Sequence, residues 1–236
     1  SVVVGDLVNI VGDVSGDTGS LARIVAVQPR RNSLSRTIDD AGAFEKTIAA
    51  NLDQMIIVAA SADPSPRQGF IDRCLAVAFD QGIKPIIVMS KADLADPDEF
   101  LSAYKDLEVK YLKLKRGDDL TQLHKILEAK VSVLIGHSGV GKSTLVNALL
   151  GIEKRDTGDV NLTTGRGRHT SSSAISFELP NGGWIIDTPG VRSFGLEHID
   201  KSRVIASFTE FESVIASCPK NCSHDEATCA LNNYVK

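Results

Sequence analysis

The segment GHSGVGKST at 136–144 has the residue types and spacing of a phosphate-binding loop. It follows the strand-like run VSVLIG and precedes a helical pattern that ends near Gly151. Its glycines let the backbone curl, so that the N–H groups of residues 138–143 point at phosphate oxygens, and the positive end of the helix dipole faces the same anion. We therefore expect a nucleoside phosphate to bind at this turn.

The side chains of this loop have separate expected roles. Lys142 would bridge the β- and γ-phosphates, and the Ser143 hydroxyl would coordinate Mg²⁺. Further phosphate contacts are expected from Ser138, Gly139, Val140, Gly141 and Thr144. The motif identifies neither the base nor the reaction, because hydrolysis and phosphoryl transfer both use it.

DTPG at 187–190 could complete the phosphate site, because it follows the strand-like run WIID. Asp187 at the strand end can hold a Mg²⁺-bound water, and the N–H of Gly190 can bond the γ-phosphate. The same four residues are also a common surface turn. Beside a phosphate loop in one sheet, the ligand role is the favoured interpretation.

The stretch TTGRGRHTSSS at 163–173 is polar and glycine-rich. A GTPase needs a mobile segment at this point of the chain, with a threonine hydroxyl that senses the γ-phosphate through Mg²⁺. Thr170 is the first candidate for that Mg²⁺ ligand, and Thr164 is the second. A solvated loop with no ligand role is the alternative.

The tetrad SKAD at 90–93 is close to the Asn-Lys-x-Asp sequence with which GTPases bind guanine. Ser90 begins this candidate binding segment. The stem of Lys91 would pack along the base plane. Asp93 would accept hydrogen bonds from guanine N1–H and the 2-amino group, which adenine lacks. In most GTPases this tetrad follows the phosphate loop, whereas here it precedes it. Cutting a sheet in one loop and joining its old termini leaves the strand neighbours unchanged, so a circularly permuted domain would restore the site. A chance match is the alternative.

The C-terminal segment CPKNCSHDEATC supplies three thiols and one imidazole, from Cys218, Cys222, His224 and Cys229. This set completes a tetrahedral Zn²⁺ site with no open position, which is typical of a structural site. Few apolar residues surround it, so metal ligation would provide the missing folding energy. The alternative is a disulfide with one loose thiol, which a reducing cytosol disfavours.

Alternating elements indicate an α/β sheet that positions these motifs. Helical patterns at 69–81 and 118–129 separate strand-like runs, and the turn PNGG predicts that the last two strands are antiparallel. The result is a mostly parallel six-stranded sheet, with one antiparallel strand. The six strand-like runs are 54–60, 86–89, 109–114, 131–136, 174–179 and 184–187.

Outside this sheet, the runs 6–14 and 20–27 are β-like and joined by the turn VSGDTG, and 30–47 has the polar, basic composition of a linker or exposed loop. Residues 200–217 are helical in pattern. Arg30, Arg31 and Arg36 form a local basic patch, although such runs are usually solvated.

The combined motifs resemble one family over nearly the whole chain: the circularly permuted GTPases of bacterial small-ribosomal-subunit assembly (RsgA, also called YjeQ or YloQ). The segments that carry the resemblance are VGDLVNI, IAANLDQMIIV, FIDRCL, GHSGVGKSTLVNAL, GRGRHT, DTPGVRSFGL and the Cys/His tail. It implies a partial OB-fold β-barrel at 1–36, a linker at 37–47, a circularly permuted P-loop GTPase domain at 48–199, and a small α-helical zinc-binding module at 200–236.

The resemblance also implies an activity and its partners. These are GTP hydrolysis that is slow alone and stimulated by the small ribosomal subunit, a role in late maturation of that subunit, and contacts of the OB-fold and zinc module with ribosomal RNA. GTP or GDP, Mg²⁺ and Zn²⁺ would be bound.

Three features depart from the family pattern. Ser90 stands where the family usually has Asn, whose amide helps to bind the base and braces the phosphate loop, so guanine affinity could be lower. The second guanine-contacting loop falls near 113–115 and has no recognisable motif. The β-rich block at the amino end is too short for the five strands of an OB-fold.

Hydrolysis requires a group that orients the attacking water, and Ras-like enzymes place a Gln directly after DxxG. Val191 occupies that position here and cannot hydrogen-bond water. His169 is the candidate to accept or relay the proton, and the resemblance indicates the same residue. The alternative is that His169 contacts ribosomal RNA together with Arg166 and Arg168.

The bulk composition suits an ordinary globular protein. Of 236 residues, 42% are hydrophobic and 24% charged, with a net charge of −4. No global basic field attracts nucleic acid, and the apolar runs are strand-sized rather than membrane-sized. No secretory leader is recognisable, so we expect a cytoplasmic protein. We also expect it to be a monomer. Two alternative functions stay open, an RNA-binding switch with negligible turnover and a P-loop ATPase or kinase for which Asp93 would be irrelevant.

Overall fold

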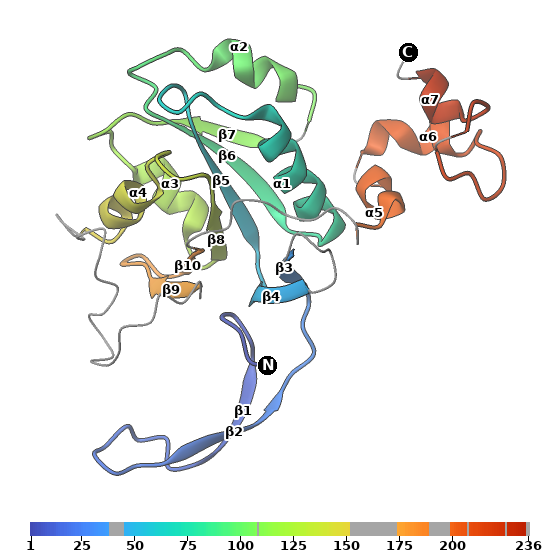
Figure 1. Cartoon of the computed structure of the whole chain (residues 1–236). Helices are drawn as coiled ribbons and strands as arrows, with labels where there is room; N and C mark the ends of the chain where they lie inside the picture. The colour runs from blue at the N-terminus through green and yellow to red at the C-terminus, as the bar shows by residue number, and fades with distance from the viewer. Residues whose placement is uncertain are drawn as a thin grey trace.

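The computed structural model describes residues 1–37, 45–107, 109–151, 174–188, 199–206, 208–224 and 226–234. At its centre is a six-stranded sheet with strand order β7-β6-β5-β8-β10-β9 (Figure 1). Five strands are parallel, and β9 pairs antiparallel with β10, so both parts of the sequence prediction are confirmed. The strands are β5 (Gln54–Ala60), β6 (Lys84–Ser90), β7 (Lys110–Lys113), β8 (Val131–Ile135), β9 (Ile175–Glu178) and β10 (Trp184–Asp187).

Helices cover both faces of this sheet, which explains why its central strands are apolar at consecutive positions. Every residue of β5 is buried. Ile57 belongs to the core cluster under α1 (Gln68–Asp80), whereas its neighbour Ile56 belongs to the cluster under α3 (Thr121–Leu127) and α4 (Lys142–Leu149). Alternate side chains of one strand therefore hold helices on opposite faces.

A short helical segment follows β6 and closes the edge of the sheet near β7. It consists of α2 (Asp98–Leu101) and a 3₁₀ turn (Ser102–Tyr104). Leu101 and Tyr104 are buried in the same cluster as Ile57, and the Tyr104 hydroxyl donates to Asp72 of α1 at 2.9 Å. The segment is thus packed onto the α1 face.

The amino-terminal part contains two hairpins. The strands β1 (Val8–Gly12) and β2 (Ala22–Val27) pair antiparallel and extend away from the sheet (Figure 1). The strands β3 (Ser33–Thr37) and β4 (Glu45–Ala50) also pair antiparallel. The loop expected at 30–47 is therefore wrong where these strands lie, and the linker expected at 37–47 overlaps β4.

The reason for this difference lies in the few apolar residues of β3 and β4. Leu34, between two serines, is fully buried, and Ile48 and Ala49 join the α1-side core. The polar composition of this segment gave no sign that β3 and β4 pair. Their inward side chains complete the α1-side core. Within the described part, the domain boundaries at 36, 47 and 199 stay predictions.

The carboxyl-terminal part is a chain of short helices. The expected helical pattern at 200–217 breaks into α5 (Lys201–Ala206), a 3₁₀ turn (Thr209–Phe211) and α6 (Glu212–Ile215), and α7 (Ala230–Tyr234) follows. Aromatic rings connect this part to α1, with centroid distances of 5.3 Å for Phe79–Phe208 and 5.4 Å for Phe208–Phe211. The backbone N–H of Asp200 also donates to Asp80 of α1 at 3.2 Å.

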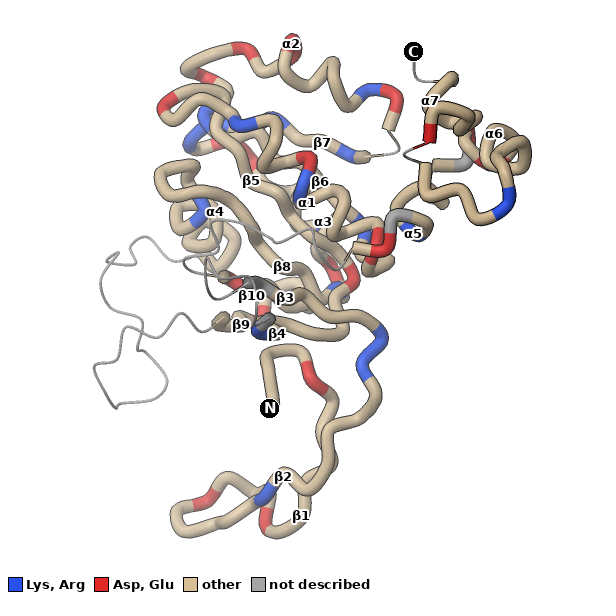
Figure 2. The backbone as a smooth tube through the Cα atoms, turned by 45° about the vertical axis from the view of Figure 1, so that its right-hand side comes forward, with Lys and Arg blue, Asp and Glu red and all other residues tan. Residues whose placement is uncertain are grey.

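Charges of both signs are interspersed along the described chain (Figure 2). Within the described residues, each helix is too short or too polar to cross a lipid bilayer.

Candidate nucleotide site and metal cluster

The predicted phosphate loop lies between β8 and α4, at the carboxyl edge of the parallel strands. Gly139 and Gly141 have φ values of +82° and +89°, a left-handed conformation that favours glycine. A Cβ on Gly136 would lie 2.4 Å from the carbonyl oxygen of Val58 on β5, so only glycine fits there. The loop can therefore curl tightly against β5 and begin α4 at Lys142, as the anion-binding geometry requires.

Lys142 is folded over this loop. Its Nζ donates to the carbonyl oxygens of Gly136 at 2.7 Å and His137 at 3.4 Å. Burial lowers the pKa of Lys142, and the nearby Asp187 carboxylate acts in the opposite direction. A phosphate oxygen would compete with these two carbonyls for the same ammonium group, which suits the predicted role.

Ser90 joins the SKAD tetrad to the phosphate loop. Its hydroxyl lies 2.6 Å from the carbonyl oxygen of Val140 and 3.2 Å from that of Ala59. One hydroxyl proton serves both acceptors, and Val140 is the nearer. Ser90 and Val140 are fifty positions apart in sequence. The two motifs that appear in reversed order are therefore adjacent in space.

The rest of the tetrad forms a tight turn after β6. Lys91 has a φ of +54°, its Nζ donates to the carbonyl oxygen of Asp63, and its own carbonyl accepts from Leu94 N–H at 2.9 Å. Ala92 N–H donates to the carbonyl of Leu114 at 3.1 Å, which brings the 113–115 segment beside the tetrad. Asp93 is exposed at the tip of this turn.

DTPG begins where β10 ends beside β8, with Asp187 opposite Leu134. Asp187 therefore lies at the carboxyl edge with the phosphate loop. Thr188, to which the sequence analysis gave no role, is 3% exposed, and its hydroxyl donates to the Leu134 carbonyl at 2.8 Å. Its position inside a polar turn gave no signal of this anchoring contact. Gly190, Thr170 and Thr164 lie outside the described residues, as do His169 and Val191.

His137 is a second contact that the sequence analysis missed. Its ring lies 4.1 Å from that of Phe70 on α1, and its Nε2 is buried without a hydrogen-bond partner among the described residues. Burial, followed by the charges of Arg67 and Lys142, lowers the pKa of His137. A neutral imidazole thus packs the phosphate loop against α1, beside a cavity of about 60 Å³.

The four predicted metal ligands converge near α6 and α7. Their ligand atoms all lie within 4.8 Å of one another. The sulfurs of Cys218 and Cys229 are 3.9 Å apart, and tetrahedral Zn–S bonds of about 2.3 Å place two sulfurs about 3.8 Å apart. His224 Nδ1 lies 3.8 Å from the Cys218 sulfur and 3.4 Å from the Cys229 sulfur. The donor set and its spacing fit a zinc ion.

One hydrogen bond must change before this cluster holds a metal. The Cys222 thiol donates to Glu226 at 3.1 Å, and this contact, together with burial and the neighbouring Cys229, raises the pKa of the thiol to about 12. A coordinating cysteine is a thiolate, so metal binding would release that proton. Ser223 N–H, which also donates to Glu226, would continue to hold the carboxylate.

Comparisons with known proteins agree with this geometry. A family model described as RsgA GTPase matches residues 27–197. A protein of Pseudomonas aeruginosa named small ribosomal subunit biogenesis GTPase RsgA is 42% identical over 219 residues, which cover 88% of this chain and 63% of that protein. A protein of the same name from Shewanella oneidensis is 41% identical over 247 residues, which cover 100% of this chain and 69% of that protein.

Two solved structures share the fold. The crystal structure of YjeQ from Thermotoga maritima has a TM-score of 0.70 and 27% identity, covering 100% of this chain and 77% of that one. The structure of YloQ, described as a circularly permuted GTPase, has a TM-score of 0.69 and 23% identity, covering 100% of this chain and 74% of that one. The chain spans about 63% of the length of the Pseudomonas aeruginosa relative.

Proposed function

Because the chain belongs to the RsgA GTPase family, we propose that it binds GTP at the carboxyl edge of the central sheet and hydrolyses it to GDP and phosphate. We further propose that the small ribosomal subunit stimulates this hydrolysis during late maturation of the subunit. One observation carries the proposal: the 2.6 Å contact between Ser90 and Val140 joins the guanine tetrad to the phosphate loop.

The nucleotide would lie across that junction. Lys142 and the loop N–H groups would hold the phosphates, Ser143 and Thr170 would ligate Mg²⁺, and the base would lie toward Asp93. Ser90 braces the phosphate loop through its hydroxyl, but it offers no amide to the base. We therefore expect guanine selectivity to depend mainly on Asp93.

Asp93→Asn tests the base assignment. Loss of the carboxylate leaves the guanine 2-amino group without its acceptor, so GDP affinity should fall roughly 100-fold or more. Asparagine presents one acceptor and one donor, which match N1–H and the 2-carbonyl of xanthine, so affinity for xanthosine diphosphate should rise. Asp96→Asn, in the same loop, is the matched control. Equal GDP and ADP affinities in the unsubstituted protein would overturn the proposal.

His169 is proposed to orient or deprotonate the attacking water. The test is single-turnover hydrolysis by His169→Ala at saturating GTP and saturating small subunits, with Arg168→Ala as control. A catalytic His169 predicts a slow rate that saturation does not restore. A wild-type rate at saturation would assign His169 to RNA contact.

A second candidate function is an RNA-binding assembly factor that uses GTP and GDP only as a switch. Val191 after the DTPG motif favours it, because this residue cannot orient water. Purified small subunits separate the two functions. Stimulated turnover supports the enzyme, whereas nucleotide-dependent subunit binding without turnover supports the switch.

The Cys/His cluster is proposed to bind a structural Zn²⁺, with Cys218, Cys222, His224 and Cys229 as ligands. The closed ligand set and the 3.9 Å sulfur separation support this. Metal analysis should give one zinc per chain, lost in Cys229→Ser. We also propose that the protein acts as a cytoplasmic monomer on the ribosomal subunit and its RNA.

A further inference from the structure

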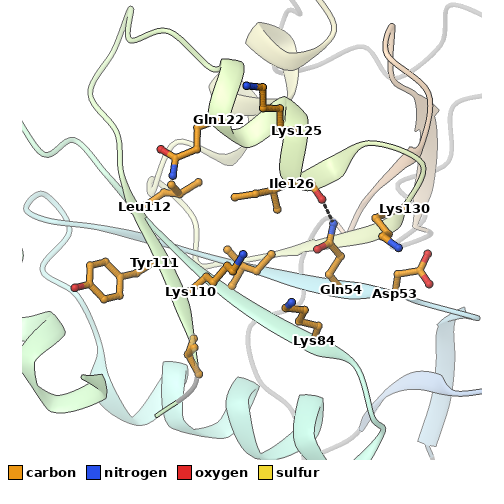
Figure 3. Close-up of a pocket in the computed structure, with 12 residues that line it drawn as sticks. Asp53, Gln54, Lys84, Lys110, Tyr111, Leu112, Gln122, Lys125, Ile126 and Lys130 are labelled. Atoms are coloured by element: carbon orange, nitrogen blue, oxygen red, sulfur yellow. Dashed lines mark hydrogen bonds between the residues drawn. The ribbon is translucent and has the colours of Figure 1, made fainter. Parts of the chain in front are cut away.

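A large groove lies at the amino ends of the parallel strands, across the sheet from the nucleotide site. It has a volume of about 770 Å³ and runs between α3 and the beginnings of β5, β6 and β7 (Figure 3). Four lysines line it: Lys84, Lys110, Lys125 and Lys130. Three of them stand at or next to the first residue of a strand, and Lys125 belongs to α3 (Figure 3).

The positive charge of this groove is not neutralised within the described residues. All four lysines are exposed, and none forms an ion pair or side-chain hydrogen bond with another described residue. One carboxylate lines the groove, that of Asp53, and it already accepts from Arg31 at 2.9 Å and from Val131 N–H at 2.8 Å. A chain with a net charge of −4 thus carries a concentrated cationic surface.

Hydrogen bonds hold the floor of the groove in place, and an exposed tyrosine lies at its rim. Gln54 donates to the Ile126 carbonyl at 2.7 Å and to the Ser132 hydroxyl at 3.1 Å, which ties β5 to α3 and β8. Tyr111 lies at the rim and is 47% exposed (Figure 3). Exposed tyrosines next to basic residues can stack on the bases of single-stranded nucleic acids.

From these features we propose that the four-lysine groove binds the phosphate backbone of single-stranded RNA, with Tyr111 stacking on a base. Lysines on flexible stems act as point charges, which suits repeated phosphates of variable position. The groove is lined by no turn of N–H groups like that of the phosphate loop, so a single small phosphate ester is the poorer fit. The proposal rests on the proposed partnership with small-subunit RNA and assigns a surface to it.

Ion pairing distinguishes Arg30 and Arg31 from the four lysines of the groove. Arg30 and Arg31, which form part of the basic patch expected from the sequence, pair with Asp6 at 2.7 Å and with Asp53 at 2.9 Å. They are therefore committed to contacts within the chain. The groove and the nucleotide site occupy opposite edges of one sheet, so RNA and GTP can bind together.

The test is binding of the full chain to an unstructured 20-nucleotide oligouridine, measured by fluorescence anisotropy between about 50 and 200 mM salt. Each lost phosphate contact should reduce the salt slope by about 0.7. Lys110→Glu with Lys125→Glu should weaken binding roughly 10- to 100-fold and lower the slope by about 1.4. If the charge reversal impairs folding, the milder pair Lys110→Gln with Lys125→Gln replaces it. This pair should show the same change in salt slope.

Two further variants make the result specific. Lys46→Glu with Lys105→Glu removes the same charge from exposed sites outside the groove and should leave affinity and slope near wild type. Tyr111→Ala should weaken binding about tenfold without changing the slope, because stacking releases no counterions. GDP affinity should stay unchanged in all of these proteins.

Two outcomes overturn the inference. If the groove and control variants bind oligouridine equally, the groove is not an RNA site. If groove variants lose affinity for small subunits but not for oligouridine, the partner of the groove is a ribosomal protein. Absence of stimulated GTP turnover in the wild type would contradict the proposed function and leave the oligouridine result standing.

Discussion

The central sheet and the carboxyl-terminal Cys/His module differ in what their interiors contain. Every residue of β5 is buried, whereas α6 and α7 have no buried residue among those described. The sheet is held by apolar burial on both faces, and the module has four potential metal ligands in place of a core. The comparison indicates that the module depends on a few polar bonds, while the sheet spreads its stability over many side chains.

The largest effect should come from removing the zinc ion proposed for the module. Chelation of zinc, or Cys229→Ser, should eliminate on the order of 10 kcal/mol of folding free energy from the module. Hydrogen exchange should then become fast at 208–234, while amides of β5 stay protected. Equal protection of the module with and without metal would refute the difference between the two regions.

Truncating a core side chain of the sheet should have a smaller effect on stability, but one that extends to the whole sheet domain. Ile57 is fully buried, and Ile57→Ala should lower the free energy of unfolding by about 2–5 kcal/mol through lost burial and a cavity. Urea unfolding followed by the fluorescence of Trp184 would measure it. The zinc content should not change, and a loss of zinc in this variant would mean that the two regions fold as one unit.

The polar bond that anchors the turn after β10 should matter much less than a candidate metal ligand in the module. Thr188→Val keeps the shape of the buried side chain but removes its hydrogen bond to Leu134. We expect a loss of about 1 kcal/mol in the free energy of unfolding, by the same urea titration. A loss as large as that of Ile57→Ala would show that polar bonds also dominate the sheet.

The smallest effect should come from the β1–β2 hairpin, whose strands are exposed along most of their length. Leu21 is 84% exposed, so Leu21→Ser should change the free energy of unfolding by less than about 0.5 kcal/mol. Thermal unfolding by circular dichroism would detect a larger change, which would imply that the hairpin packs on the rest of the chain in solution.

Elements that one continuous stretch of residues determines were predictable from the sequence. The strand 54–60 agrees with β5 at both ends because seven consecutive buried positions leave a long apolar run. The four candidate metal ligands are also local, since all of them lie within one short segment. In both cases, the residues that interact are close together along the chain or repeat a simple period.

Contacts between distant segments were not predictable in the same way. The proximity of the two motifs was expected from the permuted motif order and the family resemblance, but the bond from the Ser90 hydroxyl to Val140 depends on the spatial order of β6, β5 and β8, which residue spacing alone does not specify. The four lysines of the groove also have no common spacing. Three of them meet because parallel strands begin at the same edge, and α3 brings the fourth, Lys125, beside them. Buried Leu34 was missed because a serine flanks it on each side, and Ile48 because the polar residues 45–47 precede it.

The helix α1 contacts both functional ends of the molecule. Phe70 near its start packs on His137 of the phosphate loop, and Phe79 near its end packs on Phe208. Its thirteen residues form a stiff rod about 20 Å long. A force that displaces the carboxyl-terminal helices would therefore be transmitted through α1 to the phosphate loop.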